Sequence, residues 1–122
     1  MKVGPTKEQC IHDICRFPLL CKEPGVTPLE VVRKTGYSVF CEDIKIKDII
    51  DELKKDKNSI TTWLNFTADK RWTPAWGVVQ KNSGYELFYM STACEIELKV
   101  NFKDPFEACA FMIRMEMEEK IE

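Results

Sequence analysis

The chain has 122 residues, of which 44% are hydrophobic and 31% are charged. This composition excludes a disordered protein, and the length predicts one domain over residues 1–122 with an apolar core and a charged surface. The 18 basic and 20 acidic side chains give a formal net charge of −2. Because a general nucleic-acid-binding protein needs a surplus of Lys and Arg, we expect no direct nucleic-acid partner.

No apolar run approaches the roughly 18 residues needed to cross a bilayer, and the first residues lack the apolar stretch of a signal peptide. We therefore expect a cytoplasmic protein with no membrane partner. The six cysteines would suggest disulfides in a small secreted protein. In the cytoplasm thiols stay reduced, so we expect no disulfide here.

Two helices are predicted near the N-terminus. Thr6 can cap the first helix, together with a glutamine three residues later, and Pro18 is expected to end it. Thr27 and Pro28 mark the start of the second helix, because threonine caps a helix and proline fits its first position. Gly36 is typical of the end of such a helix.

Two further helices are predicted in the middle of the chain. Across residues 46–53 apolar side chains recur every three or four positions, while lysines and acids occupy the other face. This is the pattern of an amphipathic helix. Ser59 can cap the next helix, and Pro74 prevents that helix from extending much beyond Trp72.

The pattern then changes to that of β-strands. Residues 76–81 and 85–90 predict a hairpin, because Asn82 and Gly84 supply turn chemistry between segments rich in strand-forming side chains. In segment 95–102 apolar and polar residues alternate, which predicts a half-buried third strand. Its predicted inward-facing row is Ile96, Leu98, Val100 and Phe102.

A last helix is predicted to begin at Asp104 and Pro105, which again combine a capping side chain with proline at the first helical position. Its apolar stripe should pack on the apolar side of the sheet. The predicted fold class is therefore α+β, with N-terminal helices, then a three-stranded antiparallel meander packed by a C-terminal helix.

Candidate metal ligands gather near the N-terminus, where Cys10, His12, Cys15 and Cys21 offer soft ligands for zinc. Their spacing is not that of a standard zinc knuckle, and Cys10 and His12 would lie about 200° apart on a helix. We therefore expect no metal and no cofactor. A zinc site built from these four side chains is the alternative interpretation.

The sequence shows no catalytic pattern. The single histidine, His12, could pair with Cys15 as base and nucleophile, but no orienting group accompanies them. The five glycines form no phosphate-binding loop. We therefore expect neither an enzyme nor a protein with a small-molecule substrate.

Acidic residues gather between positions 42 and 52, where they are interleaved with lysines. Such mixed charge is typical of a solvated helix face, and a binding surface is the second interpretation. The acids are Glu42, Asp43, Asp48, Asp51 and Glu52.

The segments W-L-N-F-T-A-D-K-R-W-T-P-A-W-G-V-V, Y-E-L-F-Y-M and N-F-K-D-P-F-E-A-C-A-F-M-I-R-M-E-M follow one another in the second half of the chain. Over residues 28–119 the chain resembles small bacterial immunity proteins of polymorphic-toxin and contact-dependent growth inhibition systems. The resemblance implies a cytoplasmic protein that binds the C-terminal domain of one cognate toxin, often a nuclease. It would block the active site or substrate groove of that domain and needs no chemistry of its own.

On that resemblance, the acids would oppose the basic groove of a nuclease, and an aromatic or arginine anchor would supply most of the affinity. The charged corner before the hairpin also has a structural interpretation, in which Asp69 and Arg71 tie it together while Trp63 and Trp76 lie in the core. The alternative function is a small cytoplasmic metal-binding or nucleic-acid-associated regulatory module that uses the N-terminal Cys/His segment. The candidate toxin-binding residues are Glu42, Asp43, Asp48, Asp51, Glu52, Asp69, Arg71 and Trp72.

Overall fold

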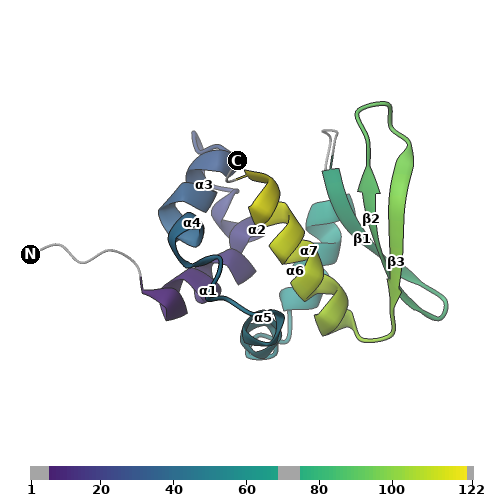
Figure 1. The fold of residues 1–122 in the computed structure, drawn as a ribbon, viewed down its shortest axis with the longest axis horizontal. Helices are drawn as coiled ribbons and strands as arrows, with labels where there is room; N and C mark the ends of the chain where they lie inside the picture. The colour runs from purple at the N-terminus through teal and green to yellow at the C-terminus, as the bar shows by residue number, and fades with distance from the viewer. Residues whose placement is uncertain (1–5, 69–74, 121–122) are drawn as a thin grey trace, which may run out of the picture.

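A computed structural model describes residues 6–68 and 75–120, and these residues confirm the predicted α+β fold (Figure 1). Within them a three-stranded antiparallel sheet is followed by a single helix, as predicted. No helix in the described ranges is long and apolar enough to cross a membrane. The elements are α1 (Lys7–Cys15), α2 (Phe17–Leu20), α3 (Pro28–Thr35), α4 (Tyr37–Phe40), α5 (Ile46–Leu53), α6 (Ser59–Ala68), β1 (Ala75–Lys81), β2 (Gly84–Met90), β3 (Ile96–Phe102) and α7 (Pro105–Lys120).

The predicted helix starts are confirmed at three capping residues. The Thr6 hydroxyl accepts the third backbone N–H of α1 (3.1 Å), and the Thr27 hydroxyl accepts the equivalent N–H of α3 (3.2 Å). The Asp104 carboxylate accepts the N–H of Phe106 in the first turn of α7 (2.9 Å). Gly36 ends α3 with φ of 78°, a conformation that glycine adopts without a steric penalty.

Two one-turn helices were not predicted, and two local predictions were wrong. α2 and α4 have four residues each, too few to show a helical period in the sequence. Pro18 does not end the first helix, because α1 already ends at Cys15 and Pro18 lies in the first turn of α2. Ser59 is the first residue of α6, and its hydroxyl donates to the carbonyl of Leu53 (2.8 Å), which closes the connection from α5.

The strands form the predicted meander, in the order β1-β2-β3. Lys81 pairs with Gly84, so only Asn82 and Ser83 lie between the first two strands. Gly84 has φ of 153°, and a Cβ atom at this position would lie 2.3 Å from the carbonyl oxygen of Phe102. The hairpin therefore requires glycine at position 84, where a backbone carbonyl of β3 lies against it.

α7 lies between helices α1 to α5 and the sheet in Figure 1, while α6 packs directly on β1. Its predicted apolar stripe is buried at Cys109, Ile113 and Met117, but Ala108 and Met112 are fully buried as well. A helix that is apolar on more than one face packs against two layers. α7 accordingly contacts α5 on one side and β1 and β2 on the other.

The third strand differs from its prediction in two ways. Leu98 is 46% exposed and Val100 is 39% exposed, so β3 is not half-buried along its length. The cause is the position of α7, which packs mainly on β1 and β2 and reaches β3 where Phe111 stacks on Phe102 (5.4 Å between ring centroids). Apolar alternation predicts a shared face, but it does not predict how far a covering helix extends.

The predicted single row on β3 is also interrupted by a register shift. Leu98 pairs with Tyr89, whereas Ile96 pairs with Met90, which leaves Glu97 as the extra residue of a β-bulge. Adjacent residues of β2 point to opposite faces of the sheet, so their partners Ile96 and Leu98 do so too. The prediction that Ile96 shares a face with Leu98 was therefore wrong.

Trp63 lies in the core, as predicted, with no exposed surface. Its indole N–H donates to the carbonyl of Cys15 (2.8 Å), and its ring stacks with Phe17 and meets Phe66 edge-on. Trp76 is half-buried against the core, with its ring 4.9 Å from that of Tyr89.

Candidate functional site

The turn between α4 and α5, residues 41–44, is held by an arginine from a distant part of the chain. Arg114 on α7 donates from Nη1 to the carbonyl of Ile44 and from Nη2 to the carbonyl of Cys41 (3.2 Å). A guanidinium presents several N–H donors in a rigid plane, so one side chain can fix both ends of a turn. We call residues 41–44 the acidic turn.

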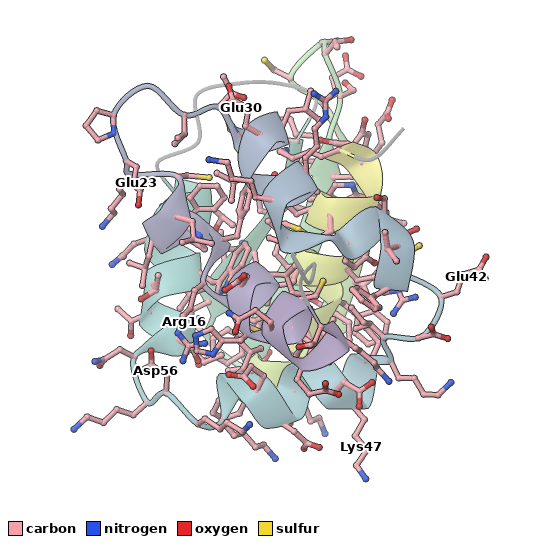
Figure 2. The ribbon with its side chains drawn as sticks, turned by 90° about the vertical axis from the view of Figure 1, so that its left-hand side faces the viewer. Arg16, Glu23, Glu30, Glu42, Lys47 and Asp56 are labelled. Atoms are coloured by element: carbon pink, nitrogen blue, oxygen red, sulfur yellow. The ribbon has the colours of Figure 1, made fainter. Side chains whose placement is uncertain are left out.

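The acidic turn presents the two acids between its fixed ends to solvent. Glu42 and Asp43 are both exposed, and Figure 2 shows Glu42 pointing away from the body of the molecule. Within residues 6–68 and 75–120, no side chain pairs with either carboxylate. These charges are therefore held on an ordered backbone and remain available to a partner.

The two other acidic candidates on α5, half-buried Asp48 and exposed Asp51, have different surroundings. Asp48 accepts the backbone N–H of Lys45 (2.9 Å), which caps α5, and it lies 4.0 Å from the ammonium of Lys7. Asp51 is exposed, and none of the described residues pairs with its carboxylate. Asp48 thus stabilises the helix start, while Asp51 is free in the same sense as the acids of the acidic turn.

Glu52 is used inside the molecule and is only 9% exposed. Its carboxylate lies 3.2 Å from Arg16, from His12 and from Lys55. Burial acts to raise the pKa of Glu52, but hydrogen bonds from Lys55, Arg16 and His12 outweigh burial and hold this pKa below its usual range. Glu52 therefore links α5 to α1, and its carboxylate is occupied within the molecule.

The four candidate zinc ligands are not brought together. Cys10 and Cys15 are buried in the core, whereas His12 is exposed and directed to Glu52. Cys21 is half-buried beyond the end of α1. In the part of the chain that the structure describes, no group of three or more His, Cys, Asp or Glu side chains is arranged to hold a metal ion.

Burial also makes the core cysteines Cys10, Cys15 and Cys109 poor nucleophiles. It raises the pKa of Cys10 to about 11 and that of Cys109 to about 12, and it raises the pKa of Cys15 further. At neutral pH such groups are thiols, and the thiolate is the reactive form. The side chains of Cys10 and Cys15 therefore contribute to packing.

A surface groove of about 370 Å³ lies between α2, the start of α3 and α6. Its lining is mostly apolar and includes Leu19, Pro28 and Phe66, with Lys22 as the charged residue. The lining thiol, Cys21, has its pKa raised to about 11, chiefly by burial. The groove thus has the composition of a contact surface and contains no pair of acid and base.

Three candidates from the sequence, Asp69, Arg71 and Trp72, lie outside the described residues. Conversely, Arg114 was not identified from the sequence. The available signal was a lone arginine inside the apolar run A-F-M-I-R-M of the last helix. A cation in such a run needs a polar partner when it is partly buried, but the sequence does not show that the partner lies 70 residues away at Ile44.

Comparisons of this chain with protein families, with curated proteins and with solved structures each find no match.

Proposed function

We propose that the protein is an immunity protein, which acts in the cytoplasm by binding the C-terminal domain of one cognate bacterial toxin and covering its active site or substrate groove. The observation that carries the proposal is the acidic turn. An arginine from α7 fixes its backbone at both ends, and its two carboxylates are directed to solvent.

Such an arrangement suits recognition of a basic surface. An acid on an ordered backbone loses little conformational freedom on binding, so more of its interaction with a cation contributes to affinity. Opposed charges also raise the association rate and exclude partners of the wrong sign. A nuclease carries basic residues to bind phosphate, and it is therefore the class of toxin we propose as partner.

Asp51 extends the same charge along α5, whereas Asp48 and Glu52 serve the fold. The proposed contact residues in the described part of the chain are Glu42, Asp43 and Asp51.

The test is co-purification of this chain with the C-terminal domain encoded immediately upstream of its gene, followed by titration of their affinity. We expect a stoichiometric complex with a Kd of about 1 nM or lower, and survival of cells that express both proteins. Glu42→Lys should weaken the complex by about tenfold or more, because it places a cation against a basic surface.

Glu23→Lys is the matched control, since it makes the same charge change at an exposed position that Figure 2 shows on the other side of the molecule from Glu42. It should leave the affinity within about threefold of the original value. The proposal fails if no complex forms while the upstream domain remains toxic. Equal loss in both variants would assign binding to net charge and remove the acidic turn from the interface.

A further inference from the structure

The two edges of the sheet differ in what covers them. Along β1, the Thr67 hydroxyl of α6 donates to the carbonyl of Val78 (2.9 Å), so α6 occupies the outer edge of that strand. β3 is the other edge, and none of the described residues hydrogen-bonds to its outer side. An open edge offers a row of unpaired backbone N–H and C=O groups that another strand can use.

The ladder indicates which groups on β3 point outward. Because the Val78 carbonyl accepts a hydrogen bond from Thr67, the backbone N–H and C=O groups of Val78 point away from β2. The backbone groups of its partner Leu87 then point away from β1 and form hydrogen bonds with β3. Leu87 pairs with Val100, so Val100 bonds inward to β2. The alternate residues Lys99 and Asn101 therefore direct their N–H and C=O groups outward.

We propose that two copies of this chain form a dimer by pairing their β3 strands antiparallel, with Val100 on the two-fold axis. In this register Lys99 of one copy lies opposite Asn101 of the other, on both sides of the axis. The outward backbone groups of these two residues then form hydrogen bonds in both directions. Leu98 meets Phe102 of the second copy, and Val100 meets Val100, all on the same face of the sheet.

Charge selects this register over its neighbours. A two-fold axis at Lys99 would set lysine against lysine, and an axis at Asn101 would set Lys99 against Lys103. An axis at Leu98 would run the pairing through the bulge at Glu97, where the regular ladder ends. With the axis at Val100, the regular pairing runs from Leu98 to Phe102, and the residues just beyond its ends, Glu97 of one copy and Lys103 of the other, carry opposite charges.

The same arrangement limits assembly to two copies. Pairing through β3 makes a six-stranded sheet whose outer edges are both β1, and α6 already occupies that edge. A two-fold contact between identical edges is closed, so no strand is left to extend the sheet. The proposal is independent of the toxin-binding function and needs only this chain for its test.

The first test is sedimentation equilibrium of the purified full chain up to about 0.5 mM. We expect a monomer–dimer equilibrium whose Kd changes in opposite directions for two variants of one exposed residue. Asn101→Lys places lysine opposite Lys99 twice and should weaken the dimer by about tenfold, whereas Asn101→Glu should tighten it by a similar factor. The controls are Asn65→Lys and Asn65→Glu, which make the same changes at an exposed position on α6 and should shift the Kd by less than about twofold.

The second test determines the pairing register by oxidative cross-linking of introduced cysteines. It uses a Cys94→Ser background, because Cys94 is exposed beside β3 and could form a disulfide itself. Val100→Cys brings two thiols together at the axis, where facing Cα atoms lie about 4.5–5.5 Å apart and suit a disulfide. Leu98→Cys is the control, because each copy of position 98 faces position 102. A chain that stays monomeric overturns the proposal. If Asn101→Lys weakens toxin binding in such a monomer, the edge of β3 belongs to the toxin interface instead. A dimer that responds equally to both Asn101 variants, or cross-links no better through position 100 than through 98, overturns the proposal as well.

Discussion

The strands β1 and β2, compared with the edge strand β3, show how one sequence pattern leads to different burial on a single face of the sheet. Val78 on β1 and Leu87 on β2 are 1% and 4% exposed, because α7 and α6 cover that side. Leu98 on β3 belongs to the same face and is 46% exposed. Alternation in a strand predicts which side chains share a face, and the reach of the covering helix then determines which of them contribute to stability.

The largest expected effect tests this contrast directly. Leu87→Ala removes a buried side chain and should lower the free energy of unfolding by about 2–5 kcal/mol. Leu98→Ala removes the same atoms from a half-exposed site and should cost less than about 1 kcal/mol. Urea denaturation at low protein concentration, which keeps the chain monomeric, measures both. Equal costs would contradict the difference in burial.

A second prediction concerns Gly84, where the hairpin lies against the Phe102 carbonyl of β3. Gly84→Ala would bring a Cβ atom to 2.3 Å from the Phe102 carbonyl oxygen and also has to adopt a positive φ. We expect a loss of about 1–3 kcal/mol of unfolding free energy. Gly25→Ala is the control, because Gly25 also has a positive φ (80°) but has open space around its Cβ position. If Gly25→Ala costs as much, strain alone explains the effect and the contact with β3 does not.

A third prediction removes part of the cover of β1. Thr67→Val keeps the shape of the side chain and deletes the hydroxyl, which lies 2.9 Å from the Val78 carbonyl and 3.1 Å from the Leu64 carbonyl of its own helix. The change should cost about 1 kcal/mol in thermal or urea unfolding. Thr61→Val on the exposed side of the same helix should change stability by less than about 0.5 kcal/mol. Faster amide exchange near Val78 in the Thr67 variant alone would show that the edge has opened.

The smallest effect is expected at acid pH and concerns the helical layer, where Glu52 links α1 to α5. The pKa of Glu52 is held below its ordinary value, so its contribution to stability is fully present above the ordinary value of 4.5. That contribution is lost as the pH falls through the lowered pKa of the folded state. Unfolding free energies measured from pH 6 down to about pH 3 should therefore fall more steeply for the original chain than for Glu52→Gln. Parallel curves would show that Glu52 is not the titrating link between α1 and α5.

Local chemistry was predictable from the sequence, and long-range geometry was not. The starts at Thr6, Thr27 and Asp104 were predicted because each capping side chain lies within a few residues of a second local signal. That signal is a glutamine after Thr6 and a proline after Thr27 and Asp104. The bulge at Glu97 depends on pairing with β2 and leaves no mark in a sequence that alternates without interruption.

The candidate site shows the same limit. The acids of the acidic turn were identified from the sequence as a charged segment, but their support was not, because Arg114 lies 70 residues from Ile44 in the chain. Glu52 read as one more surface acid, since its partners Arg16 and His12 lie 36 and 40 residues away. A single sequence gives the charge of each side chain and does not show which distant groups neutralise it.

The position of α7 also has a consequence for how the chain is synthesised. Residues 105–120 follow every other described element in the chain, yet they occupy the middle of the molecule between two layers. Translation proceeds at about 5–20 residues per second, so the helical layer and the sheet leave the ribosome before the helix that joins them. Until α7 emerges, Trp63 and Val78 line surfaces without their central partner, and the acidic turn lacks its arginine. The core and the proposed contact surface are therefore completed together, once α7 has been synthesised.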